Sequence, residues 1–266
     1  MPFVEVNNIQ LYYELHGSPE KETVVLSNGI LMSTASWNFQ IPLLSRHFQV
    51  LVYDCRGMWQ SDHPEEPYSM EQHAEDLSGL LTQLNIERAH IAGISYGSEV
   101  SMMFALKFPL KTKSLLIFDG VSQIDPLLKS LGDMWVAAAE QKNAGLLLKV
   151  TTPLNFSEEW IIKNHKILPM LEEKYHQLDF EAFIRLMESF YDLNITASLN
   201  QIQAPTLVVV GEKDILKTRE YSEKIAKMIP GAEFFIVPGS GHALCLEKPH
   251  EFNTLVMGFV YKNADQ

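Results

Sequence analysis

Residues 88–104, RAHIAGISYGSEVSMMF, constrain the fold more than any other segment of the sequence. A short apolar strand is expected over residues 89–94, and a helix-forming segment follows the GISYG turn directly. A Gly-x-Ser-x-Gly pattern between a strand and a helix lifts its serine, here Ser95, out of the sheet and exposes the hydroxyl group. Such a serine lies in a strained backbone conformation, where the strand and the helix pass very close together. Small residues two positions before and after it avoid a clash, which explains Gly93 and Gly97.

Two later loops carry further side chains with catalytic chemistry. Residues 204–211, APTLVVVG, are typical of a fully buried strand, and Asp214 lies just beyond them. Residues 233–237 predict a second short strand, and the glycine-rich loop after it carries His242. Both loops follow the carboxyl ends of strands, where open parallel sheets have their ligand sites. The order serine, acid, histidine along the chain therefore indicates one shared site.

The remaining pattern begins with strands and then alternates between strands and helices. Alternating apolar and polar residues on both sides of Asn7-Asn8 predict an antiparallel hairpin. The alternation that follows predicts a mostly parallel sheet that is covered on both faces. The expected strands lie at residues 3–6, 10–15, 23–27, 49–53, 89–94, 114–119, 204–211 and 233–237, and helices are expected at residues 37–47 and 70–84.

Five segments resemble recurring blocks of the α/β-hydrolase superfamily, most closely its small carboxylesterase and 3-oxoadipate enol-lactone hydrolase-like branch. They are FVEVNNIQLYYELHG, VLVYDCRGMWQSD, GISYG, TLVVVGEKD and GSGHALCLEKPHEF. The resemblance implies an α/β-hydrolase fold, with a mostly parallel eight-stranded sheet, helices on both faces and a helical cap. Residues 1–120 and 197–266 would form the core. The segment that matches worst, residues 121–196, would form the cap.

The resemblance also implies roles for individual residues. Ser95 would be the nucleophile, His242 the general base and Asp214 the acid that orients the histidine ring. Backbone N–H groups of Tyr96 and Ile30 would form the oxyanion hole. The loop around Ile30 reads SNGI where the superfamily often has His-Gly, but a backbone donor requires no particular side chain.

Other residues compete with these assignments. Asp119 is the rival of Asp214, because some superfamily members carry the acid after the strand at residues 114–119. His90 and His47 are rivals of His242, although neither follows a late strand in a glycine-rich loop.

Three neighbouring positions are expected to be structural. Ser98 stands where the superfamily often has a second glycine, so the helix after Ser95 is expected to pack less tightly against the sheet. Asp54 and Arg56 are predicted to form a partly buried ion pair that braces a loop. Cys245 is expected to pack as a small hydrophobic residue.

Residues 126–199 have long helical patterns and no clear strand, as a cap over Ser95 would. Most apolar side chains of this segment are expected to bury its own faces. A minority would cover an apolar substrate pocket, since small-ligand sites are mostly apolar. For that pocket we predict Trp135, Trp160 and Met187 of the cap, together with Leu31 of the oxyanion loop.

Composition excludes several classes of function. A formal charge of -12 leaves no basic stripe for nucleic acid and disfavours an anionic membrane surface. The first residues lack a secretory signal, and no apolar run is long enough to span a bilayer. The two cysteines have no metal-ligand spacing. We therefore expect a cytoplasmic monomer or homodimer without a metal or cofactor.

The expected activity is cleavage of a carboxylic ester or lactone of a small, largely apolar substrate through an acyl-enzyme. Two alternatives use the same residues. An acyltransferase would pass the acyl group to an alcohol instead of water, and a ligand receptor on this scaffold would turn over slowly.

Overall fold

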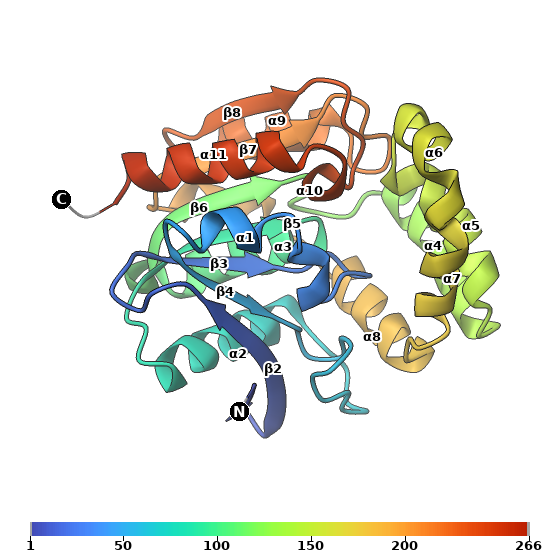
Figure 1. Ribbon diagram of the computed structural model, residues 1–266, viewed down its shortest axis with the longest axis horizontal. Helices are drawn as coiled ribbons and strands as arrows, with labels where there is room; N and C mark the ends of the chain where they lie inside the picture. Colours follow the sequence, from blue (N-terminus) through green and yellow to red (C-terminus); the bar gives the residue numbers. More distant parts are fainter. Residues whose placement is uncertain (1, 265–266) are drawn as a thin grey trace.

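The computed structural model describes residues 2–264, which form one eight-stranded sheet with helices on both faces (Figure 1). The strand order is β1-β2-β4-β3-β5-β6-β7-β8. Only β2 runs against its neighbours, so the sheet is mostly parallel, as predicted. The strands are β1 (Phe3–Val6), β2 (Ile9–His16), β3 (Thr23–Ser27), β4 (Gln49–Tyr53), β5 (Ala89–Ile94), β6 (Thr112–Phe118), β7 (Thr206–Gly211) and β8 (Glu233–Val237).

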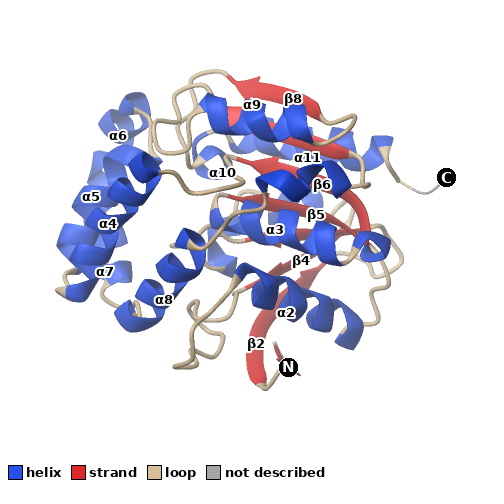
Figure 2. Ribbon diagram, turned by 180° about the vertical axis from the view of Figure 1, so that it is seen from behind, coloured by secondary structure: helices blue, strands red, loops and turns tan. Residues whose placement is uncertain are grey.

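Helices from distant parts of the sequence cover the two faces of the sheet. Figure 1 shows α1, α10 and α11 in front of it, and Figure 2, from behind, shows α2, α3 and α9. Each face has its own apolar cluster, because the central strands are buried on both sides. These helices are α1 (Ile41–Leu44), α2 (Met70–Gln83), α3 (Tyr96–Lys107), α9 (Arg219–Met228), α10 (Leu244–Glu247) and α11 (Pro249–Lys262).

A group of helices between β6 and β7 stands over the edge of the sheet where the parallel strands end (Figure 1). We call this group, residues 121–196, the cap. Among its contacts, α4 packs on α8 and on α5, and α5 packs on α7. Its helices are α4 (Pro126–Glu140), α5 (Ala144–Asn155), α6 (Glu158–Asn164), α7 (Leu168–Tyr175) and α8 (Phe180–Tyr191), with the short 3-10 turn η3 (His165–Ile167) between α6 and α7. Two further 3-10 turns, η2 (Pro109–Lys111) and η4 (Thr196–Gln201), precede β6 and β7.

One expected helix differs from the structure. Residues 37–47 do not form a single helix; the chain makes a 3-10 turn, η1 (Thr34–Trp37), and then the single turn of α1. Pro42 is the physical reason, because it has no N–H and is tolerated only in the first turn of a helix. The hairpin is as predicted, with Asn7 and Asn8 at φ 49° and 63° in the turn.

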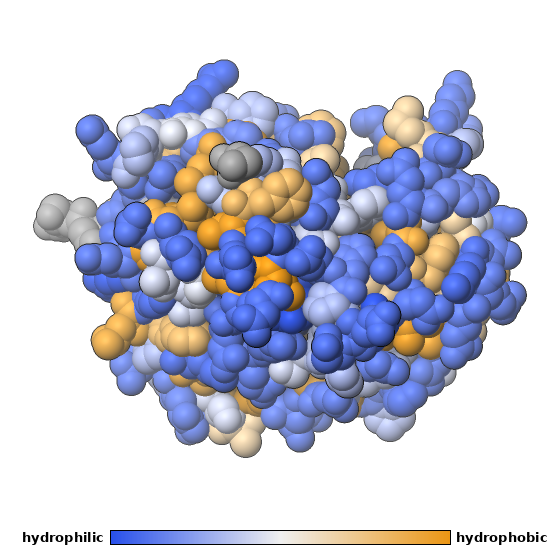
Figure 3. Space-filling model, turned by 90° about the horizontal axis from the view of Figure 1, so that it is seen from below, coloured by the Kyte–Doolittle hydropathy of each residue, from blue (hydrophilic) through white to orange (hydrophobic). Residues whose placement is uncertain are grey.

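The lower face of the molecule, in the orientation of Figure 1, is largely hydrophilic. The view in Figure 3 shows charged and polar side chains over most of one face, with separate small apolar patches. Within residues 2–264, no helix has the length and apolar character that crossing a bilayer requires.

The turn between β5 and α3 holds the predicted strain. Ser95 has φ 54° and ψ −120°, a backbone conformation that residues other than glycine rarely adopt. A Cβ atom on Gly93 would lie 2.0 Å from the carbonyl oxygen of Gly97, and one on Gly97 would lie 2.1 Å from that of Ser27. The Ser98 hydroxyl lies 2.6 Å from the carbonyl oxygen of Gly93, so this departure from a second glycine joins the helix to the strand by a hydrogen bond.

Replacing Gly97 by alanine is expected to lower the free energy of unfolding by about 3 kcal/mol or more, because the obstructing atom is backbone and cannot move aside cheaply. Gly258→Ala is the matched control. Nothing lies within 4 Å of its added Cβ, and the residue is exposed inside α11. There alanine is expected to be neutral or to stabilise by up to about 1 kcal/mol. Urea denaturation measures both, and equal effects of the two substitutions would contradict the crowding at Gly97.

Candidate active site

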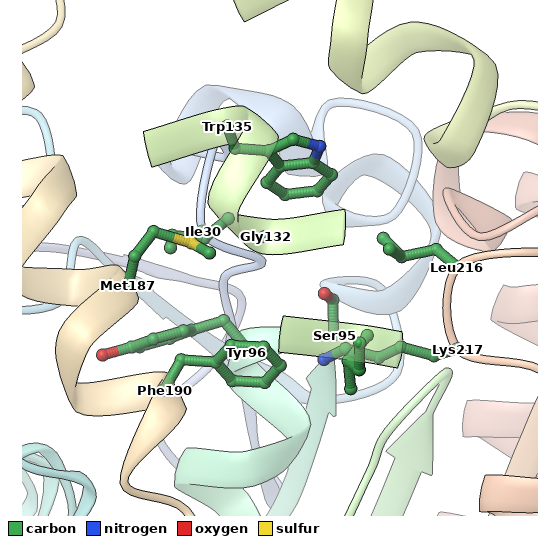
Figure 4. A pocket seen from close by; sticks show the side chains of 10 residues that line it. Ile30, Ser95, Tyr96, Gly132, Trp135, Met187, Phe190, Leu216 and Lys217 are labelled. Atoms are coloured by element: carbon green, nitrogen blue, oxygen red, sulfur yellow. The ribbon is translucent and has the colours of Figure 1, made fainter. Parts of the chain in front are cut away.

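Ser95 opens α3, and its hydroxyl group points into a cavity beneath the cap (Figure 4). Two cavities meet at Ser95 and Ile30. The tyrosine-side cavity also contains Tyr96 in its lining. The histidine-side cavity contains His242 instead. A bound molecule can therefore extend from Ser95 in two directions.

His242 and Asp214 meet as two loops leave the sheet. The His242 ring places Nδ1 2.7 Å from Asp214 Oδ2, and both side chains are buried. Asp214 Oδ1 accepts the backbone N–H groups of Leu216 and Lys217, each at 2.9 Å, which fixes the carboxylate in its own loop. His242 Nε2 is buried and has no hydrogen-bond partner among residues 2–264. The ring thus has one anchored nitrogen and one available for chemistry.

Asp119, the rival acid, lies beside this pair. One oxygen or nitrogen of each of Asp119, Asp214 and His242 falls within 4.8 Å of the others. Asp119 follows β6 at φ 53°, and its Oδ1 accepts the Gly211 N–H at 2.8 Å. Burial, and then the charge of Asp214, raises the pKa of Asp119 well above its usual range. This shift favours the protonated form of Asp119, and Asp214 is the acid that bonds to the histidine.

Such a cluster of two carboxyl groups and a histidine has the donor types of a cation site. Asp214 Oδ2 and His242 Nδ1 are bonded to each other, however, and Asp119 Oδ1 is bonded to backbone. A cation would have to displace these hydrogen bonds, so the arrangement suits proton transfer better than metal binding.

Two residues beside Ser95, Tyr96 and Ile30, have backbone N–H groups that are free to donate. The N–H groups of Tyr96, at the start of α3, and of Ile30 donate to no other group among the described residues, and both residues line the cavities at Ser95. The loop before Ile30 is held by Asn28, which donates to Asp54 Oδ1 at 3.1 Å and accepts from Trp37 at 2.7 Å.

Asp54 and Arg56 are not a pair, so that prediction is wrong. Asp54 accepts from Asn28 and from the backbone N–H of Thr34 at 2.9 Å, whereas Arg56 makes two 2.9 Å hydrogen bonds to Asp76 on α2. Bidentate geometry favours the Arg56–Asp76 pairing. Burial raises the pKa of Asp54 to about 6.

The two rival histidines lie elsewhere. His90 Nδ1 lies 2.8 Å from the Ser114 hydroxyl on the neighbouring strand, and His47 Nδ1 lies 2.8 Å from the Tyr261 hydroxyl. Cys245 is fully buried, and burial raises the pKa of its thiol.

The four expected pocket residues separate into two groups. Trp135 lines both cavities, Met187 the tyrosine-side cavity and Leu31 the histidine-side cavity. Trp160 lines neither of them: its ring stacks on Phe156 with centroids 3.8 Å apart. It therefore supports a wall residue of the histidine-side cavity from behind.

The hydroxyl group of Tyr96 points away from Ser95 (Figure 4) and joins the core to the cap. It lies 2.7 Å from His73 Nε2 on α2 and 2.6 Å from the Ser189 hydroxyl on α8. Burial, and then the charge of Arg56, lowers the pKa of His73 to about 3. The imidazole is therefore neutral near pH 7. The two hydrogen bonds of the Tyr96 hydroxyl hold its ring in place at the wall of the tyrosine-side cavity.

The sequence analysis did not identify three charged groups near the site: the half-buried Glu247, and the buried pair Lys217 and Glu99. Glu247 accepts hydrogen bonds from the Ser157 N–H and hydroxyl groups of the cap and from the Gly241 N–H next to His242. Lys217, three residues after Asp214, pairs with Glu99 at 2.8 Å. One signal for this pair was available: Glu99 is the only acid in the otherwise uncharged first three turns of α3, YGSEVSMMFAL.

Replacing His73 by glutamine is expected to remove a pH dependence of stability. The unfolded chain protonates this histidine below about pH 6.5 and the folded protein only near pH 3, so unfolding takes up a proton between these values and stability rises with pH there. Across about pH 4 to 6 the wild-type free energy of unfolding should gain about 1.4 kcal/mol per pH unit over the variant. Asp54 acts with the opposite sign, but equally in both proteins. Parallel slopes in urea denaturation at several pH values would exclude a buried neutral His73.

Comparisons with known proteins agree with this geometry. Residues 22–249 match the family described as alpha/beta hydrolase fold. RutD of Pantoea ananatis, described as a candidate carbamate hydrolase, is 28% identical over 261 residues, which cover 96% of this chain and 94% of that protein. Two solved structures superpose with TM-scores of 0.91: MGS-M2, an alpha/beta hydrolase enzyme from a Medee basin deep-sea metagenome library (28% identical, 99% and 98% of the two chains), and the enol-lactonase of Burkholderia xenovorans LB400 (25% identical, 98% and 100%). The match over most of the chain and the sheet topology together show that this chain belongs to the α/β-hydrolase family and is a hydrolase.

Proposed function

We propose that this hydrolase cleaves a carboxylic ester or lactone of a small, largely apolar substrate, with Ser95 as its nucleophile. The observation that carries the proposal is the His242 ring, which is anchored by Asp214 through Nδ1 and leaves a buried, unpartnered Nε2 in the cavity that Ser95 also lines. A serine hydroxyl needs such a base to take its proton during attack.

The proposed first step is attack of Ser95 Oγ on the substrate carbonyl carbon. His242 Nε2 takes the hydroxyl proton as the new C–O bond forms, and Asp214 stabilises the imidazolium. The carbonyl oxygen becomes an oxyanion, which the N–H groups of Tyr96 and Ile30 would bind; each such donor is worth roughly 3–4 kcal/mol of barrier. In this structure no hydrogen bond joins Ser95 to His242, and in ligand-free sites such bonds often tighten only on substrate binding.

Release of the alcohol follows from the same geometry. His242 returns its proton to the leaving oxygen, so the leaving group must lie on the histidine side. The acyl group then lies in the tyrosine-side cavity, whose lining is mainly apolar. Water, activated by His242, would attack the acyl-enzyme and restore Ser95. For a lactone, the leaving alcohol stays attached to the acyl group, and the two cavities together would hold the ring.

Relatives support the choice of acyl chemistry. The enol-lactonase of Burkholderia xenovorans is named for a lactone, and the RutD description names a carbamate, which has an ester-like carbonyl bonded to nitrogen and oxygen. The substrate panel should therefore include esters, lactones and carbamates with the same leaving group where chemistry allows.

The first test is a burst assay with p-nitrophenyl esters of graded chain length, with intact-mass measurement of the quenched protein. Wild-type protein is expected to show an acyl adduct that water discharges quickly. Ser95→Ala should fold normally, show no adduct and lose all turnover above background. An adduct that persists until an alcohol is added would instead indicate acyl transfer or a slow, receptor-like protein, and full activity of the alanine variant would exclude Ser95.

A second prediction separates the two acids. Asp214→Asn should lower kcat by roughly 10³- to 10⁴-fold, because the amide no longer holds the histidine tautomer that accepts the proton from serine. Asp119→Asn should change kcat less than about tenfold, because asparagine has the acceptor and donor of a protonated aspartic acid. Steady-state kinetics on one ester measures both, and the reverse ranking would move the acid to Asp119.

A further inference from the structure

The tyrosine-side cavity contains one charged side chain in an apolar lining. Leu128, Trp135, Met187, Phe190 and Leu216 supply most of its walls, and Lys217 is the exception. Figure 4 shows the Lys217 side chain extending from its loop toward Ser95. The residue is only 3% exposed, so its ammonium group has been removed almost completely from bulk water.

The contacts of this ammonium group leave part of its hydrogen-bonding capacity unused. Lys217 Nζ lies 2.8 Å from Glu99 Oε2 and 4.7 Å from the centroid of the Phe190 ring. Glu99 Oε1 accepts the Val121 N–H at 2.8 Å, so the carboxylate is satisfied on both oxygens. A lysine has three N–H donors. Glu99 takes one and the face of Phe190 a second, and the third has no acceptor among the described residues.

A buried ion pair is energetically unfavourable in the apolar wall of a cavity, because both charges lose their hydration. Removing two charges from water opposes folding, and proteins with apolar residues of similar size at such positions are often equally or more stable. Packing alone therefore does not explain the Lys217–Glu99 pair. A hydrogen-bond donor at the wall of a cavity does explain it, because a few placed polar groups give an apolar ligand site its specificity.

We propose that Lys217 is a specificity-determining residue that binds a neutral acceptor oxygen, a ketone or hydroxyl oxygen, on the acyl part of the substrate. This inference rests on the proposed function, which assigns the acyl group to the tyrosine-side cavity. Glu99 already balances the charge of Lys217, so a second carboxylate in the cavity would lack a counter-charge. The neutral oxygen needs no further charge and satisfies the remaining N–H.

The test compares acyl groups of equal length. The substrates are p-nitrophenyl pentanoate and 4-oxopentanoate, and p-nitrophenyl hexanoate and 5-oxohexanoate, each corrected for its uncatalysed rate. Wild-type protein is expected to favour the oxo esters by about tenfold or more in kcat/KM, as a hydrogen bond to a charged group provides. Lys217→Met should lose this preference, so that the oxo and plain esters of each pair have the same kcat/KM in this variant.

Two further variants control for charge and folding. Lys217→Met leaves the buried Glu99 carboxylate without a counter-charge, so the double variant Lys217→Met/Glu99→Gln, which removes both charges, is measured beside it. It should also show no oxo preference. Lys213→Met is the matched control: it is an exposed lysine next to Asp214 in the same loop, and the wild-type preference should persist.

The following outcomes would contradict the proposed role of Lys217. Equal normalised rates for wild-type protein on oxo and plain esters, or an oxo preference that survives Lys217→Met, would overturn the role of Lys217 and leave the serine mechanism standing. A larger preference for p-nitrophenyl hydrogen succinate would show that the pair selects an anion, which overturns the neutral acceptor.

If no ester is cleaved at all, the proposed function fails separately, and binding decides the inference. Thermal shifts of the Ser95→Ala protein with 4-oxopentanoate and pentanoate then test it: a larger shift with the oxo acid that disappears in Ser95→Ala/Lys217→Met supports recognition, and equal shifts refute it.

Discussion

The close approach of β5, α3 and the end of β3 is the constraint on which the site depends. The carbonyl oxygen of Ser27 lies so near Gly97 that a single added carbon would collide with it. This contact forces Ser95 to φ 54° and brings the first turn of α3 against the loop that carries Ile30. The proposed nucleophile and oxyanion donors are therefore positioned by backbone packing rather than by flexible side chains, which is the preorganisation that acyl chemistry needs.

The sequence predicts well what depends on local pattern. Short apolar runs predicted the bounds of β3 and β4, and the Asn7-Asn8 turn predicted the antiparallel hairpin. Ser95, Asp214 and His242 could be named because each follows a strand in a recognisable loop. The expected helix over residues 37–47 was wrong because it ran through Pro42, which is tolerated only in the first turn of a helix and sets where α1 begins.

What the sequence does not predict depends on contacts between distant segments. The partner of Arg56 is Asp76 rather than Asp54, because the fold brings α2 against that loop. Lys217 and Glu99 are 118 positions apart, and they pair only because the fold brings the loop after β7 against α3. Trp160 has the large apolar side chain that is typical of a pocket residue, but Phe156, on which it stacks, lines the histidine-side cavity instead. The residue type alone therefore does not predict whether an aromatic side chain of the cap lines a cavity or packs on another side chain.

The hydrogen bonds between the cap and the loop of His242 link access to reactivity. Lifting residues 155–157 from the core would break both bonds from Ser157 to Glu247, and the 2.7 Å bond from the Ala243 N–H to the Asn155 carbonyl. At about 1 kcal/mol each, the three bonds would keep an open form on the order of 1% of the population or less. Ala243 follows His242 directly, so the open form would also hold its base less firmly. The open form would thus let solvent and substrate exchange without catalysing the reaction, and the protein would be active only after the cap closes.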